Sequence, residues 1–194
     1  MSIYCPDETL QTLVREFQQS QTSLDHQLER VDALLLAYPE DARLHFMRGS
    51  TLAGLGRLIE AHQGLSRAVA LAPEFAIARF QLGFFQLTSG EADAALDTWG
   101  RLDRLDDGHY LRKFVDGLRC LVRDDIQGAV ALLRDGVALN QENPPLNHDM
   151  QLLADRLIEL APNPGNAAAD PNVSETSLIL RQFTRPLSKN GDAP

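Results

Sequence analysis

The sequence has few of the residues that mark extracellular, membrane-spanning or exported proteins. Its two cysteines, Cys5 and Cys120, lie far apart and make no disulfide framework, so we expect a reducing compartment. No segment approaches the run of about 18 apolar residues that spans a bilayer, and we expect no membrane insertion. The first residues carry neither a basic run nor an apolar stretch of signal-peptide length. We therefore expect a cytoplasmic protein.

Positive charge is also scarce, since the 194 residues carry a formal net charge of −9. A surface that binds nucleic acid or an anionic membrane needs clustered Lys and Arg to displace counterions. The chain has no such cluster, and we expect neither kind of partner.

Motifs for catalysis or metal binding are missing from the sequence. The five histidines include no pair at the i, i+4 spacing of a helical metal site, and there is no nucleophile elbow or Gly-rich phosphate loop. The densest polar cluster, Asp103, Asp106, Asp107 and His109, fits either a hard-metal site or a solvated turn in which an Asp caps the next helix. We favour the turn, and expect no metal, no cofactor and no enzymatic activity.

What the chain does have is a repeat. Residues of one kind recur every 34 positions, small ones where backbones must approach and large apolar ones where a gap must be filled. The columns are Gly49, Gly83 and Gly117; Phe46, Phe80 and Phe114; Ala61, Ala95 and Ala129; Leu65, Trp99 and Leu133; Leu71, Leu105 and Leu139; and the pairs Pro39 with Pro73 and Gly56 with Gly90.

These columns resemble the tetratricopeptide repeat family. One copy contains Ala42-Arg-Leu-His-Phe-Met-Arg-Gly49, then Leu-Gly56, Glu60-Ala61 and Ala70-Leu71-Ala72-Pro73, and the next contains Phe75-Ala-Ile-Ala-Arg-Phe-Gln-Leu-Gly83, Ser-Gly90 and Ala94-Ala95. The resemblance covers roughly residues 40–140. It implies an all-α solenoid of stacked helical hairpins, each unable to bury its apolar face alone.

We predict the organisation of the chain from apolar spacing and helix breakers. An atypical first hairpin has its apolar residues over 10–17 and 24–38, three full hairpins follow near 41–72, 75–106 and 109–140, and a capping helix after Asn143-Pro144-Pro145 has apolar residues over 150–161. Together they form a repeat domain over residues 1–161. Residues 162–176, rich in Pro, Asn and Ala, are predicted to be a flexible linker.

Residues 177–194 differ in character from the acidic body. This tail carries Leu178, Ile179, Leu180 and Phe183 together with Arg181 and Arg185. An apolar, slightly basic segment beyond a linker is typical of a docking motif.

In the family that the chain resembles, the first helix of each hairpin lines a concave binding face. The resemblance implies that the face here contains Arg43, Phe46, Ile77, Phe80, Phe84, Leu87, Leu111, Phe114, Leu118 and Leu121, with Arg79 as a further basic residue. The Phe column also fits packing between hairpins. Phe84, Leu87, Leu118 and Leu121 exceed what one contact needs, and we predict that they form a binding stripe.

An apolar stripe favours an apolar segment of a partner protein, such as an amphipathic helix. We therefore expect a protein-binding adaptor or a chaperone-like scaffold. In an alternative hypothesis, the tail occupies the same face or joins two copies into an oligomer. A third is an accessory subunit of an enzyme or of a secretion or assembly complex.

Overall fold

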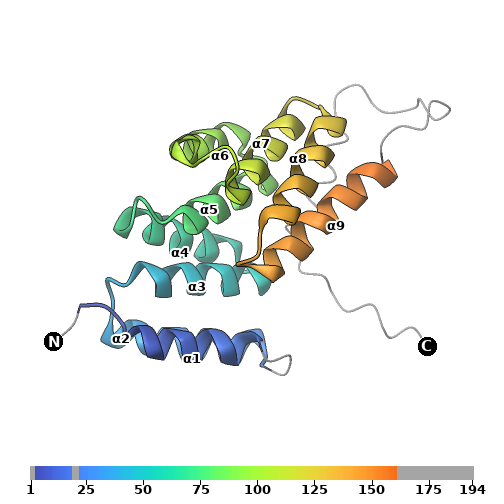
Figure 1. Ribbon diagram of the computed structural model, residues 1–194. Helices are drawn as coiled ribbons and strands as arrows, with labels where there is room; N and C mark the ends of the chain where they lie inside the picture. The colour runs from blue at the N-terminus through green and yellow to red at the C-terminus, as the bar shows by residue number, and fades with distance from the viewer. Residues whose placement is uncertain (1–2, 19–21, 161–194) are drawn as a thin grey trace, which may run out of the picture. The chain divides into compact units, whose positions relative to one another are not determined.

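A computed structural model describes residues 3–18 and 22–160, and every regular element among them is helical (Figure 1). The prediction of an all-α chain is confirmed for this part of the sequence. The predicted linker and tail, with Leu178, Ile179, Leu180 and Phe183, lie outside the described residues. The elements are α1 (Asp7–Gln18), α2 (Leu24–Ala37), α3 (Ala42–Gly54), α4 (Leu58–Leu71), α5 (Ala76–Thr88), α6 (Ala92–Trp99), the 3-10 helix η1 (Gly100–Arg104), α7 (Tyr110–Val122), α8 (Ile126–Leu139) and α9 (Pro144–Leu160).

Helix starts follow the repeat of the sequence. Helices α3, α5 and α7 begin at Ala42, Ala76 and Tyr110, which lie 34 residues apart, and α4, α6 and α8 begin at residues 58, 92 and 126 with the same spacing. Helix α9 begins at Pro144, earlier than the predicted cap, because proline is well suited to the first turn of a helix and so starts α9 rather than interrupting it.

The turn within each helix pair has the same backbone geometry three times. Gly56, Gly90 and Asp124, again 34 residues apart, have φ angles of 73°, 89° and 58°. In each turn the following amide donates to a carbonyl five residues earlier: Arg57 to Leu52 at 2.9 Å, Glu91 to Gln86 at 2.8 Å and Asp125 to Cys120 at 2.9 Å. A residue with positive φ after the end of a helix is usually glycine, so Asp124 departs from the pattern of Gly56 and Gly90.

The chain divides within α5 into two compact units, the first ending at Leu82 and the second beginning at Gly83. In the first unit, Cys5, Leu10, Leu13, Val31 and Leu44 form one buried cluster. Helices α3 and α4 pack so closely that a Cβ at Gly49 would lie 2.8 Å from the backbone nitrogen of Leu65.

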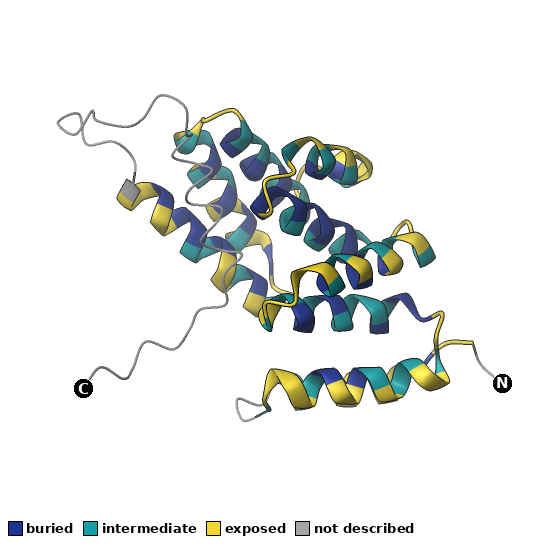
Figure 2. Ribbon diagram, turned by 180° about the vertical axis from the view of Figure 1, so that it is seen from behind, coloured by how far each residue is buried: buried dark blue, intermediate teal, exposed yellow. Residues whose placement is uncertain are grey.

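In the second unit, α7 packs on α8 and α8 on α9, whose buried residues lie along one side of the helix (Figure 2). A Cβ at Gly83 would lie 2.5 Å from Cε2 of Trp99, and one at Gly117 would lie 3.1 Å from Cγ of Leu133. The glycine column therefore marks close helix contacts, as predicted.

Arg48, Leu82 and Asp116 lie 34 residues apart and so occupy equivalent positions in successive helix pairs. Leu82 is buried, whereas the two charged residues form ion pairs in place of apolar packing. Arg48 donates from Nε to Asp32 of α2 at 2.7 Å, and Asp116 pairs with Arg112 at 3.1 Å on its own helix. These charges are satisfied by neighbours and so remain compatible with a half-buried position.

Candidate functional site

The predicted binding residues of the first unit are differently accessible. Phe46 and Ile77 are half-buried, and the Phe46 ring packs edge-on against Phe75 with 5.4 Å between centroids. Phe80 is fully buried. Arg79 is 9% exposed and donates from Nη2 to the carbonyl of Pro73 at 2.8 Å. Phe80 and Arg79 are thus part of the packing, while Phe46 and Ile77 keep some surface.

Of the four residues predicted to form the binding stripe, three are buried: Leu87 at 4%, Leu118 at 0% and Leu121 at 1% exposure. Phe84 is half-buried. We predicted that all four residues exceed the needs of packing, but Leu87, Leu118 and Leu121 are covered by the rest of the protein, and only Phe84 keeps exposed surface. A partner could reach the three leucines only if the packing around them opened.

The other two predicted residues of α7 are also buried. Leu111 is 2% exposed, and Phe114 is fully buried, with its ring 5.9 Å from that of Tyr110 and in the space that a side chain at Gly136 would need. The interpretation of Phe114 as a packing residue between helices agrees with these contacts.

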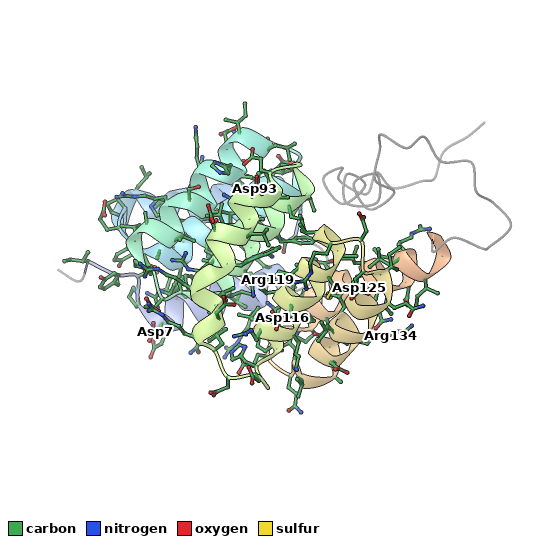
Figure 3. The ribbon with its side chains drawn as sticks, turned by 90° about the horizontal axis from the view of Figure 1, so that it is seen from above. Asp7, Asp93, Asp116, Arg119, Asp125 and Arg134 are labelled. Carbon is green, nitrogen blue, oxygen red and sulfur yellow. The ribbon has the colours of Figure 1, made fainter. Side chains whose placement is uncertain are left out.

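The polar cluster after α6 is a network of ion pairs and caps. His109 caps α7 by accepting the Leu111 amide at Nδ1, 3.1 Å away, so the cap is His109 and not the expected Asp. Arg119 donates to Asp103 at 2.7 Å and to Asp116 at 3.1 Å, and Figure 3 shows Asp116 and Arg119 side by side on α7. Within residues 3–18 and 22–160, no three His, Cys, Asp or Glu side chains are placed to hold a metal ion.

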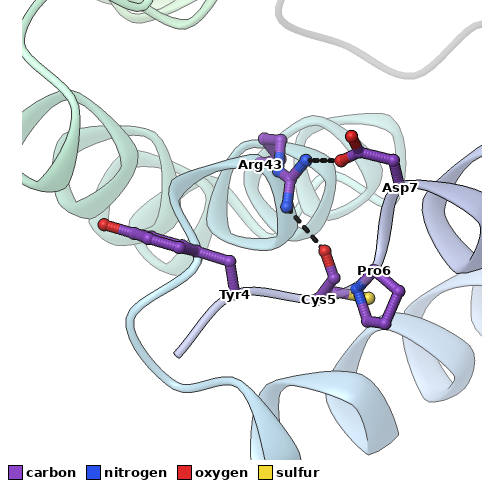
Figure 4. Close-up of a pocket in the computed structure, with 5 residues that line it drawn as sticks. All are labelled: Tyr4, Cys5, Pro6, Asp7 and Arg43. Atoms are coloured by element: carbon purple, nitrogen blue, oxygen red, sulfur yellow. Dashed lines mark hydrogen bonds and ion pairs between the residues drawn. The ribbon is translucent and has the colours of Figure 1, made fainter. Parts of the chain in front are cut away.

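An open hollow of about 440 Å³ lies in the first unit, between the segment before α1 and the start of α3 (Figure 4). Tyr4, Cys5, Pro6, Asp7 and Arg43 line it. The guanidinium of Arg43 donates to the Asp7 carboxylate at 2.6 Å and to the Cys5 carbonyl at 2.8 Å. Arg43, predicted for the concave face, is therefore occupied in holding the N-terminal segment.

Asp41 binds both Cys5 and Arg43. Its side chain is 1% exposed and accepts the amides of Cys5 and Arg43, each at 2.9 Å, and the Arg43 guanidinium at 2.7 Å. Burial alone would raise the pKa of Asp41, but the hydrogen bonds from the Arg43 side chain and the two amides lower it further than burial raises it. Asp41 is therefore a satisfied, ionised carboxylate at neutral pH.

Cys5 is the one potential thiol nucleophile among the residues that line this hollow. Burial and the neighbouring Asp41 raise the pKa of its thiol, against the opposing effect of Arg43. A thiol with a raised pKa is a poor nucleophile at neutral pH, because the thiolate is the reactive form. The arrangement is suited to holding a backbone segment rather than to catalysis.

Sequence reasoning identified Arg43 but missed its partners Cys5 and Asp41. One signal was available: Asp41 immediately precedes the first helical residue, Ala42, as a helix cap does. The bond to Cys5 joins residues 36 positions apart and has no signature in a single sequence.

Comparisons with known proteins assign no family. No known protein-family model matches the chain, and a search of curated proteins finds no significant match. In the described part of the chain, none of the helices combines the length and the apolar character needed to cross a bilayer.

Proposed function

We propose that this chain is a tetratricopeptide-like adaptor that binds an apolar segment of a partner protein along the first helices of its repeated hairpins. The observation that carries the proposal is the 34-residue recurrence of helix starts, left-handed turns and glycine contacts. Structural repeats of this period belong to solenoids, whose equivalent helices present equivalent residues to a ligand.

The residues that retain surface refine where the partner would bind. Phe46, Ile77 and Phe84, all on first helices, are half-buried, whereas the predicted α7 residues are buried. A partner would therefore engage α3 and α5 first. Aromatic and aliphatic side chains with partial exposure are suitable anchors, because they lose more apolar surface on binding than buried residues can.

The test uses a displayed library of random peptides selected on the full chain. Selected peptides should carry apolar residues at helical spacing, and fluorescence anisotropy should show at least tenfold weaker binding to Phe84→Ser and Ile77→Ser. Ile59→Ser is the matched control, because Ile59 is 78% exposed on the second helix α4. Equal loss in all three variants, or no loss in any, would reject α3 and α5 as the binding site.

The apolar residues Leu178, Ile179, Leu180 and Phe183 of the tail suggest a second candidate, in which the tail regulates access to the binding face. Deleting residues 175–194 should then increase the fluorescence of a dye that binds apolar surfaces, and should strengthen peptide binding. Unchanged dye fluorescence and peptide affinity would exclude regulation by the tail.

A further inference from the structure

The described part of the chain contains three Asp-Gly dipeptides, and the fold places them in different surroundings. They are Asp107-Gly108, Asp116-Gly117 and Asp135-Gly136, all in the second unit. The first lies in the turn between η1 and α7, whereas the other two lie inside α7 and α8. The local chemistry is the same in all three pairs, so a difference in their reactivity comes from the fold.

An Asp-Gly pair rearranges without an enzyme when its two reacting groups can meet. The backbone nitrogen of the glycine attacks Cγ of the aspartate, and a five-membered succinimide ring forms as one water leaves. A second water then opens the ring. Attack at Cγ restores aspartate, whereas attack at the main-chain carbonyl gives isoaspartate, in which the main chain runs through Cβ. Glycine is the most reactive partner because no Cβ shields its nitrogen.

The turn at Asp107-Gly108 leaves both reacting groups open. Asp107 and Gly108 are exposed, and a Cβ at Gly108 would have no atom within 4 Å beyond its chain neighbours. The turn is closed by the His109 amide, which donates to the Asp106 carbonyl at 2.8 Å. Within residues 3–18 and 22–160, the Gly108 amide has no acceptor and the Asp107 carboxylate has no cation partner. Rotation within the turn therefore breaks at most one exposed hydrogen bond.

The two helical pairs are held in place. Gly117 and Gly136 are buried, and an amide inside a helix donates to the carbonyl four residues earlier. A Cβ at Gly117 would lie 3.1 Å from Cγ of Leu133, and one at Gly136 would collide with the Phe114 ring. The Asp116 carboxylate is also bound by two arginines of its own helix. Ring closure at these pairs requires a packed helix to unwind.

We propose that Asp107 is a modification site, at which isoaspartate forms spontaneously in the folded protein, while Asp116 and Asp135 are protected by their helices. Water is the only co-reactant, and the product has the same mass as the original chain. The selectivity arises because an exposed turn opens at lower free energy than a helix with buried contacts.

Isoaspartate at residue 107 changes the start of α7. It adds one carbon to the main chain of the turn that ends at His109. His109 caps α7 by accepting the Leu111 amide at Nδ1, 3.1 Å away, and its ring stacks on that of Tyr110 with 4.8 Å between centroids. The longer turn displaces His109 from this position, so we expect the modified protein to have a lower Tm.

The test is prolonged incubation of the full chain at neutral pH, followed by trypsin digestion and electron-transfer fragmentation, which distinguishes isoaspartate from aspartate. Cleavage after Lys and Arg places the three pairs on separate peptides, 105–112, 114–119 and 135–156. Isoaspartate should accumulate on the first peptide, at residue 107, and not on the other two. In guanidinium chloride all three pairs should react at similar rates, because the protecting helices are then unfolded.

Gly108→Ala is the matched variant, because the new methyl group shields the nitrogen and meets open space in the fold. It should prevent most isoaspartate formation at Asp107 and leave the far-UV circular dichroism unchanged. Gly100→Ala is the control, since Gly100 is equally open but follows Trp99 and not an aspartate. It should leave the rate at Asp107 unchanged. Incubation should also lower the Tm of the wild type more than that of Gly108→Ala.

Three outcomes would overturn the assignment of Asp107. The first is equal accumulation of isoaspartate at all three pairs in the folded protein. The second is reaction at Asp107 in guanidinium chloride but not in the folded protein, which would show that the turn is as protective as a helix. The third is undiminished formation in Gly108→Ala. Equal changes of Tm in the wild type and Gly108→Ala would overturn the effect on the α7 cap.

Discussion

Replacing Gly83 with alanine should destabilise the protein, although alanine is the better helix former. Gly83 lies within α5, where intrinsic propensity alone predicts a gain of about 0.5–1 kcal/mol from the added methyl group. The structure predicts the opposite sign. The new Cβ would lie 2.5 Å from Cε2 and 2.6 Å from Cδ1 of Trp99, and closer still to Nε1.

The magnitude follows from what Trp99 can do in response. Its side chain is fully buried, and the colliding atoms belong to a rigid ring rather than to the flexible end of a side chain. Overpacking of this kind costs about 1–3 kcal/mol, which exceeds the propensity gain. We expect a net loss of about 1–2 kcal/mol in the free energy of unfolding, and a Tm lower by about 2–8 °C.

The assay is urea unfolding followed by far-UV circular dichroism and by tryptophan fluorescence. Trp99 is the only tryptophan in the chain, so its emission reports directly on the contact. Gly100→Ala is the matched control, because Gly100 has helical φ and ψ angles of −53° and −30° and no atom within 4 Å of an added Cβ. It should leave stability unchanged or raise it by up to about 1 kcal/mol, the gain that propensity alone predicts. A Gly83→Ala protein as stable as the wild type, with unchanged emission, would refute the close contact between α5 and α6.

Three further predictions test other parts of the structure. Asp124→Gly should stabilise the protein by about 1 kcal/mol in urea unfolding, and Gly90→Ala should destabilise it by a similar amount, because both positions have a positive φ angle that glycine adopts most easily. Gly90 has open space around it, so the effect of the added methyl group is on the backbone and not on packing. A change of the same sign in both variants would contradict this. Because the pKa of Asp41 is lowered on folding, its ionised form stabilises the protein above its ordinary pKa of about 4, and this contribution is lost as the pH falls through the lower folded value. The stability gap between wild type and Asp41→Asn, measured by urea unfolding from neutral pH downward, should therefore narrow in acid, and a constant gap would argue against an ionised Asp41. Asn140 is 4% exposed and accepts the amides of residues 142 and 143 through Oδ1. Asn140→Ala should therefore lower the free energy of unfolding by about 1–3 kcal/mol, measured by thermal unfolding, whereas Gln141→Ala, at an exposed position, should have almost no effect. Equal effects would show that the Asn140 bonds add no stability.

The sequence alone determined where the helices lie, because this information is local and periodic. Apolar spacing and the breakers at Pro39, Gly56, Pro73 and Gly90 predicted the helix pairs over 41–72, 75–106 and 109–140, and the structure has helices in all these ranges. The glycine column predicted close contacts in the same way. A position that carries glycine in three successive copies and leaves little room for a Cβ is under a similar steric constraint in each.

The accessibility of side chains was decided by tertiary structure. Phe84 and Leu118 occupy equivalent repeat positions and are both apolar, yet Phe84 is half-buried and Leu118 is fully buried. Periodicity shows that a residue is on the apolar side of its helix, but the width of the covered surface depends on what packs against it. No spacing rule supplies that information.

The bonds of the segment before α1 also depended on the fold, since they join residues far apart in the sequence through side chains. In the sequence, Cys5 is one of two cysteines that lie far apart, and Asp41 is recognisable only as a possible helix cap. Packing of the segment before α1 against the first turn of α3 buries both and brings Arg43 between Asp7 and the Cys5 carbonyl. A long-range pair of this kind has no period, and the folded chain alone places its members within hydrogen-bonding distance.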